Sequence, residues 1–248
     1  MLGQEIAPTE YDLRFRCLGF PVRVSPWFWL TSAIVIWNVS ERLDHKLVGV
    51  LAVFISILIH ELGHALAIRH YGGRSEVVLA MFGGYATCNV NPSRMGNIII
   101  AAAGPAAGLL LWGVLFLLVQ QFPDRIKIAH DYVHLLIGNP IRMTDVPLWY
   151  RLTDGLLLWA NLSWSLLNLI PVWPLDGGRI SHQVIGRFRA FDSWELMLKL
   201  SILVCAGMVS WCAFEFAQHG DGDRFMLIMF ALLGFQNYQT LQASTRGR

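Results

Sequence analysis

The chain has 248 residues, a formal net charge of +2, and a composition in which hydrophobic residues make up 55%. Charged residues make up only 15%, against roughly 25% in an ordinary soluble domain, and mean hydropathy is +0.49. These values exclude a disordered chain and a coiled coil and argue against a freely soluble protein, while the small net charge gives no reason to expect a nucleic-acid partner. The length predicts a single domain over residues 1–248.

Apolar segments of membrane-spanning length recur along the chain, since a helix needs about 20 apolar residues to cross the hydrocarbon core. The first begins with Ser25-Pro26, a favourable helix start. The predicted fold class is therefore an all-α polytopic membrane protein with about six transmembrane helices and a small β-sheet at its cytoplasmic face. The predicted spans cover residues 25–41, 47–69, 95–121, 152–173, 194–216 and 224–243.

Two segments outside these spans have the pattern of strands. Within residues 12–24, apolar and basic side chains alternate over Leu13–Cys17. Within residues 75–90, Glu76–Ala80 is β-branched and apolar and is followed by Gly83-Gly84, where we expect a turn. Both lie on the same predicted side of the membrane, so we expect them to form the small sheet. The polar stretch 124–150 is predicted to be an external loop.

The distribution of lysine and arginine predicts the orientation. With six spans, the amino-terminal side carries eleven of these residues and the opposite side seven. The positive-inside rule then places both termini in the cytoplasm. No cleavable signal peptide is visible, because the first 23 residues lack an apolar core. We expect a multi-pass protein of the cell (inner) membrane.

The chemical centre of the sequence is His60-Glu61-Leu62-Gly63-His64, inside the second predicted span. Positions i and i+4 of a helix share a face, so both imidazoles can bind one metal ion. Glu61 lies beside that face and can hydrogen-bond a metal-bound water. Zinc lowers the pKa of such a water towards ~7, and Glu61 can then take its proton as general base.

The apolar surroundings make this motif more informative than in a soluble helix, where a surface His-Glu pair recurs by chance. A charged side chain near the centre of a membrane helix costs roughly 2.5–3.5 kcal/mol. Three ionisable side chains in one turn therefore indicate a metal, a cavity or a polar partner. The alternative is that they lie at a helix end and are solvated.

A third metal ligand is expected from another span, because catalytic zinc usually has three protein ligands. The fourth span ends in Asn168–Gly178, NLIPVWPLDGG, where two prolines stop the helix and two glycines free the backbone after Asp176. Asp176 is the best third-ligand candidate, and its alternative role is the N-cap of the following helix. Asn168 can stabilise an oxyanion or the substrate backbone, or can make an interhelical hydrogen bond.

At this point the sequence resembles the site-2 protease family of intramembrane zinc metallopeptidases, from about Phe20 to about Arg189. His60–His64 matches the HExxH motif of that family, and Asn168–Gly178 matches its N-x-x-P-x-x-x-L-D-G motif. Gly104-Pro105-Ala106-Ala107-Gly108 resembles its G-P-x-x-N pattern, except that Gly108 stands where many relatives have Asn.

The resemblance implies a peptide hydrolase that binds one Zn²⁺ through His60, His64 and Asp176, with Glu61 as catalytic base and Asn168 near the substrate. It also implies cleavage in or near a transmembrane helix of a membrane-protein substrate, in regulated intramembrane proteolysis. The chain is expected to be a minimal form without PDZ or cystathionine-synthase-type domains.

Two other functions use the same residues. The chief alternative is a membrane metal-ion transporter in which His60, Glu61, His64 and Asp176 form a transit site. Transporters typically contain a repeated pair of broken helices, whereas this sequence shows only one strong break. An inactive relative acting as a membrane adaptor is the third possibility, and the presence of Glu61 beside three potential ligands argues against it.

Overall fold

The computed structural model describes residues 7–37, 43–81, 83–120, 157–219 and 224–246. It divides into two compact units. We call Gln4–Pro92 with Ala103–Leu166 the sheet unit, and Met1–Gly3 with Ser93–Ala102 and Leu167–Arg248 the C-terminal unit. The predicted loop 124–150 and the start of the fourth predicted span lie outside the described residues.

The predicted sheet is present and has four strands in the order β1-β2-β3-β4. β1 and β2 form an antiparallel hairpin, β2 and β3 are parallel, and β3 and β4 are antiparallel. Gly83 and Gly84 begin β4 instead of forming the expected turn. The bounds are Leu13–Cys17 for β1, Phe20–Val24 for β2, Val77–Ala80 for β3 and Gly83–Ala86 for β4.

The hairpin turn between β1 and β2 is made by Leu18 and Gly19, both at positive φ (50° and 84°). Two central residues at positive φ are typical of the type I′ turn that matches the twist of paired strands. The exposed Leu18 carbonyl accepts a hydrogen bond from the Arg69 guanidinium (3.2 Å), which also lies over the Phe20 ring. The turn is thereby attached to the end of the second helix.

Two helices pack with the sheet. Helix α1 spans Pro26–Ile36 and begins with proline, whose fixed φ suits a first helical turn. Helix α2 spans Leu43–His70 and carries the metal-binding motif. The strands and helices share one apolar core, whose buried members are Phe20, Val22, Val24, Phe28, Ile57, Leu58, Leu62, Ala65, Val77 and Leu79. This core fixes α2 against the sheet.

Helix α3 approaches α2 closely through small residues. A side chain at Gly63 of α2 would collide with the Ala103 carbonyl and come within 2.8 Å of the Ala107 Cβ. The backbone of one helix thus lies directly on the other, as small residues allow in membrane proteins. The remaining helices are α3 (Arg94–Gln120), α6 (Leu157–Asn168), α7 (Asp176–Phe188), α8 (Ser193–His219) and α9 (Arg224–Arg246).

Three of the described helices are long and apolar enough to cross a membrane: Leu43–His70, Arg94–Leu117 and Ser193–Gln218. They correspond to the second, third and fifth predicted spans. α1 has only 11 residues, and α9 falls short because its second half carries Gln236, Asn237 and further amides. The count of six spans therefore stays a prediction.

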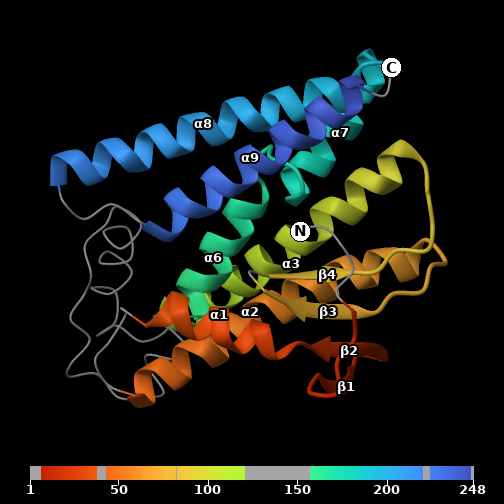
Figure 1. Ribbon diagram of the computed structural model, residues 1–248. Helices are drawn as coiled ribbons and strands as arrows, with labels where there is room; N and C mark the ends of the chain where they lie inside the picture. The colour runs from red at the N-terminus through yellow and green to blue at the C-terminus, as the bar shows by residue number, and fades with distance from the viewer. Residues whose placement is uncertain (1–6, 38–42, 82, 121–156, 220–223, 247–248) are drawn as a thin grey trace. The chain divides into compact units, whose positions relative to one another are not determined.

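The C-terminal unit has a separate core. α8 and α9 lie side by side (Figure 1), and Gly234 of α9 leaves room for Cys205 of α8 at a would-be Cβ distance of 3.1 Å. The buried residues of this core are Val172, Cys205, Phe230 and Leu233. Val172 comes from the segment that joins α6 to α7, so this segment is anchored on the α8–α9 pair.

A buried ion pair joins the hairpin to the segment before it and predicts a pH-dependent stability. Arg23 is 8% exposed, and its guanidinium lies 3.0 Å from an Asp12 carboxylate oxygen. Hydrogen bonds from Thr9, and then the nearby Arg23 charge, lower the pKa of Asp12 from 3.8 to about 2. Because the folded pKa is depressed, the stabilisation is complete above pH ~4 and is lost as the pH falls towards 2.

We therefore expect Asp12→Asn to lower the midpoint of thermal unfolding at pH 7. The difference between the midpoints of the variant and the unmodified protein should become smaller between pH 4 and pH 2. Thermal unfolding in detergent across this pH range measures the effect. The exposed neighbour Glu10 provides the control, since Glu10→Gln is expected to leave the midpoint unchanged. A gap for Asp12→Asn that stays constant down to pH 2 would contradict the assignment.

Candidate metal centre

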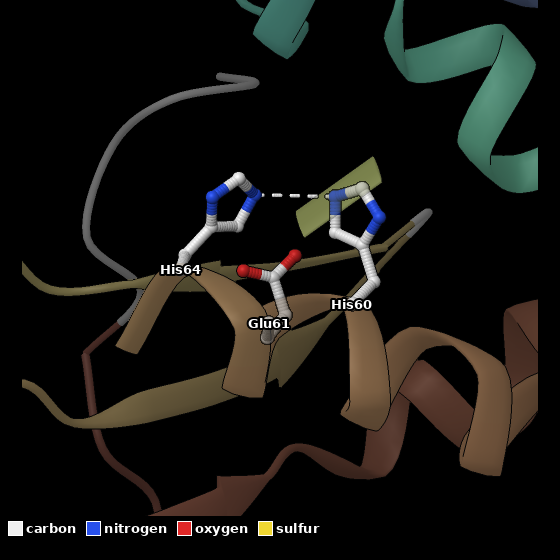
Figure 2. A group of neighbouring side chains, drawn as sticks. All are labelled: His60, Glu61 and His64. Carbon is white, nitrogen blue, oxygen red and sulfur yellow. Dashed lines mark hydrogen bonds between the residues drawn. The ribbon is translucent and has the colours of Figure 1, made fainter. Parts of the chain in front are cut away.

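The predicted motif forms a buried cluster on one face of α2. His60, Glu61 and His64 are 2%, 4% and 4% exposed. The Nε2 atoms of the two histidines face each other at 3.2 Å, and the rings meet edge to face with centroids 4.9 Å apart. Figure 2 shows the Glu61 carboxylate on the same side of the helix as both rings. The prediction that the i and i+4 imidazoles converge on one point is confirmed.

The geometry of the cluster fits a tetrahedral metal ion. Two nitrogens bound at about 2.05 Å with a tetrahedral angle are about 3.3 Å apart, close to the 3.2 Å between the histidine nitrogens. One potential ligand atom from each of His60, Glu61 and His64 lies within 4.8 Å of the others. Imidazole nitrogens are ligands that zinc prefers, so the donor set suits the ion that the sequence predicts.

Gly104 of α3 forms one wall of this site. A Cβ built at Gly104 would collide with the His64 ring and lie 2.7 Å from His60 Nε2. The two nitrogens that face each other therefore also face the bare backbone of α3. Gly104 keeps open the space in which a shared ion would lie.

The sheet forms another wall. A Cβ at Gly84 of β4 would lie 2.8 Å from Glu61 Cγ, so the strand backbone packs directly on the stem of this carboxylate. β4 is an edge of the sheet: within the described chain it pairs with β3 alone. This open edge of the sheet runs beside Glu61.

Two neighbours of the cluster were not identified from the sequence as site residues. The Trp164 ring of α6 lies edge to face with the His60 ring, with centroids 6.4 Å apart, and also contacts Gly83. The sequence marks Gly104 only as part of the segment that resembles the G-P-x-x-N pattern. The sequence does not indicate that Trp164 is a site residue, because a tryptophan in an apolar span is usually part of the core or of the membrane interface.

Asn168 and Asp176 belong to the C-terminal unit and flank the break between α6 and α7. Asn168 is the last residue of α6 and Asp176 the first of α7, and both are buried (7% and 5% exposed). Leu175 holds the N-cap position, so Asp176 is not the N-cap that was the alternative reading. Their participation in the metal site stays a prediction.

The glycine pair after Asp176 is required by a close backbone crossing. A Cβ at Gly177 would collide with the Leu169 and Ile170 carbonyls, and one at Gly178 would lie 2.6 Å from the Trp173 nitrogen. The first turn of α7 therefore lies against the backbone that follows α6, and only glycine fits at both positions. This crossing gives the predicted break a defined shape.

Comparison with known proteins agrees with this site. The family model described as peptidase family M50 matches residues 48–208. The match covers most of the chain, including the His60–His64 motif and the Asn168–Gly178 segment. The chain belongs to peptidase family M50, and the predicted resemblance to the site-2 proteases is confirmed.

Individual relatives can be named. A zinc metalloprotease of Methanocaldococcus jannaschii is 30% identical over 181 residues, covering 72% of this chain and 47% of the relative. Stage IV sporulation protein FB of Bacillus subtilis is 25% identical over 197 residues, covering 78% and 58%. The chain thus spans about half the length of these relatives. The solved site-2 protease from M. jannaschii has a similar fold, with a TM-score of 0.60, 22% identity, and coverage of 93% of this chain and 95% of that chain.

The wall at Gly104 leads to a direct prediction. Gly104→Ala should weaken zinc binding by roughly 10- to 100-fold, because the new methyl group occupies the space between the histidine nitrogens and α3. The measurement is a zinc competition titration with a chromophoric chelator on purified protein.

Gly113 is the matched control, since it lies on the same helix and a Cβ there meets nothing within 4 Å. Gly113→Ala should bind zinc as the unmodified protein does. Equal zinc affinity in Gly104→Ala and Gly113→Ala would show that the ion does not lie beside Gly104.

Proposed function

We propose that this chain is an intramembrane zinc metalloendopeptidase that hydrolyses a peptide bond in or near a transmembrane helix of a membrane protein. The observation that carries the proposal is the pair of histidine nitrogens, 3.2 Å apart and buried in an apolar helix beside Glu61. Membership of peptidase family M50 and the zinc metalloprotease names of the relatives support it.

In this proposal His60, His64 and Asp176 hold one zinc ion. The three-ligand set leaves one position open, as catalytic zinc sites do. Bound zinc supplies Lewis acidity, which polarises the scissile carbonyl and makes water more acidic. Asp176 suits the third position because a broken helix lets a carboxylate turn inward where the backbone would otherwise stay helical.

Glu61 acts as the proton carrier. Its carboxylate lies on the same side of α2 as the two rings (Figure 2) and packs against β4 at Gly84. It takes a proton from the attacking water and then delivers it to the nitrogen of the departing amine, so the net reaction adds one water across the peptide bond. In the proposal Asn168 donates a hydrogen bond to the developing oxyanion.

The edge strand β4 provides a place for an unwound substrate. Thr87 N–H donates to the Glu76 carbonyl at 2.9 Å, so odd-numbered residues of this strand face β3. The peptide groups of Gly84 and Ala86 therefore face the open edge. A substrate segment that adds to this edge as a further strand would present its backbone next to Glu61.

The membrane setting follows from the same proposal. Three candidate membrane helices support a membrane protein, and we propose six spans, both termini in the cytoplasm and a location in the cell (inner) membrane. The partner is a membrane protein with a transmembrane helix, cleaved in regulated intramembrane proteolysis. His60–His64 then lies in the cytoplasmic half of the second span, and Asp176 ends a fourth span that runs in the same direction, so we expect the two motifs to meet at the same depth.

Glu61→Gln tests the chemistry. The amide keeps the size of the side chain but cannot accept the proton, so cleavage of a fluorescently tagged model transmembrane peptide should fall roughly 100-fold or more. Zinc content, measured by plasma mass spectrometry on the same sample, should be retained. Gel-resolved cleavage in detergent or proteoliposomes gives the rate.

Glu195→Gln is the matched control, because Glu195 pairs with Lys199 on α8 (2.7 Å) and has no part in the proposed reaction. It should cleave at the normal rate. Normal cleavage by Glu61→Gln would defeat the base assignment, and zinc flux into proteoliposomes that persists in Glu61→Gln would favour the transporter.

Ala86→Pro tests the strand edge. Proline removes the N–H that faces the open side of β4 and leaves the β3 ladder intact, so cleavage should fall about tenfold at limiting substrate while zinc content stays unchanged. Ala86→Ser keeps the N–H and should retain activity. Equal rates for Ala86→Pro and Ala86→Ser would exclude strand addition at this position.

A further inference from the structure

The break between α6 and α7 is held by side chains of the last two helices. Trp173 lies in the middle of the break, and its backbone N–H and carbonyl both make hydrogen bonds to buried side chains. Its N–H donates to the Ser201 hydroxyl of α8 (3.0 Å), and its carbonyl accepts from the Asn237 amide of α9 (2.7 Å). Neither helix contributes a residue to the two sequence motifs of the site.

Ser201 is oriented for this contact. Its side chain is fully buried, and its hydroxyl donates to the Met197 carbonyl one turn earlier in α8 (2.9 Å). With its proton used in this way, the oxygen offers a lone pair to Trp173 N–H. The hydroxyl therefore acts as a fixed acceptor.

The Asn237 side chain is also held in place by hydrogen bonds. It is 1% exposed, and its side-chain nitrogen donates both to the Leu233 carbonyl of its own helix and to the Trp173 carbonyl, each at 2.7 Å. Both amide protons are used. An amide in the polar half of α9 thus replaces the intrahelical hydrogen bond that the Trp173 carbonyl lacks at the break.

Short backbone links connect Trp173 to Asp176. Leu175 N–H donates to the Val172 carbonyl (2.8 Å), and Arg179 N–H donates to the Leu175 carbonyl (3.1 Å). The Gly178 backbone also lies against Trp173, as described above. A displacement of the Trp173 backbone therefore moves the first turn of α7, in which Asp176 is the first residue.

We propose that Ser201 and Asn237 are positioning residues for the zinc ligand Asp176. They hold the two peptide groups on either side of the Trp173 Cα, and so set the direction in which the Asp176 carboxylate leaves the backbone. This inference rests on the proposed function, because it takes Asp176 as the third ligand. It assigns to α8 and α9 a part in metal binding that the motifs leave unassigned.

The test is a double-mutant cycle on zinc affinity, with the full chain in detergent micelles and a chromophoric chelator as competitor. Ser201→Ala and Asn237→Leu are each made alone and together with Asp176→Asn. In the unmodified background each should weaken zinc binding by roughly 10- to 100-fold, the range for groups that orient metal ligands. In the Asp176→Asn background neither should weaken it further.

Two variants control for general damage to the fold. Ser201→Thr keeps the hydroxyl and should restore most of the affinity lost in Ser201→Ala. Thr240→Val removes a hydroxyl that donates only within α9, to the Gln236 carbonyl (2.8 Å) and should leave zinc affinity unchanged. Ser201→Ala is the mildest change and serves as the decisive variant if Asn237→Leu does not fold.

The possible outcomes distinguish the positioning role of Ser201 and Asn237 from the proposed ligand role of Asp176. Unchanged affinity in Ser201→Ala and Asn237→Leu, with weaker binding in Asp176→Asn, would overturn the positioning role alone. The same loss with or without Asp176 would overturn it too, since the effect would then be general destabilisation. Unchanged affinity in Asp176→Asn would overturn both the third-ligand assignment and the positioning role.

Discussion

The separation of 3.2 Å between the Nε2 atoms of His60 and His64 is the constraint on which this molecule depends. Imidazoles and a carboxylate inside an apolar helix are unfavourable unless they share a polar partner. A helical spacing of four residues brings the rings together, and burial prevents water from separating them. Two imidazole nitrogens this close together are favourable when an ion or a proton is shared between the rings.

The backbone segments around His60, Glu61 and His64 are arranged so that the two nitrogens can stay this close. Gly63 and Gly104 let α3 lie directly on α2 and leave space at the nitrogens, and Gly84 brings the strand backbone against Glu61. Backbone atoms form these walls, and backbone walls are stiffer than side chains. In the C-terminal unit, Gly177 and the hydrogen bonds on Trp173 give the start of α7 an equally defined shape.

Much of this could be predicted from the sequence, because its signals are local. The strands, the long apolar helices and the i, i+4 histidine pair follow from periodicity, and the break after Asn168 follows from its prolines and glycines. The contacts of Trp164 with His60 and of Asn237 with Trp173 could not, because they join residues far apart in the chain. The amides of α9 also reduce its hydropathy, so the residues that tie α9 to the break keep this helix out of the set that is apolar enough to cross a membrane.

Zinc-edge X-ray absorption on the purified, zinc-loaded protein tests the central claim most directly, with Asp176→Asn measured in parallel. We expect two imidazole ligands and oxygen ligands at about 2.0 Å in the unmodified protein. In Asp176→Asn we expect a changed oxygen shell with both imidazoles retained. A single imidazole in the unmodified protein, or identical spectra for the two proteins, would contradict it.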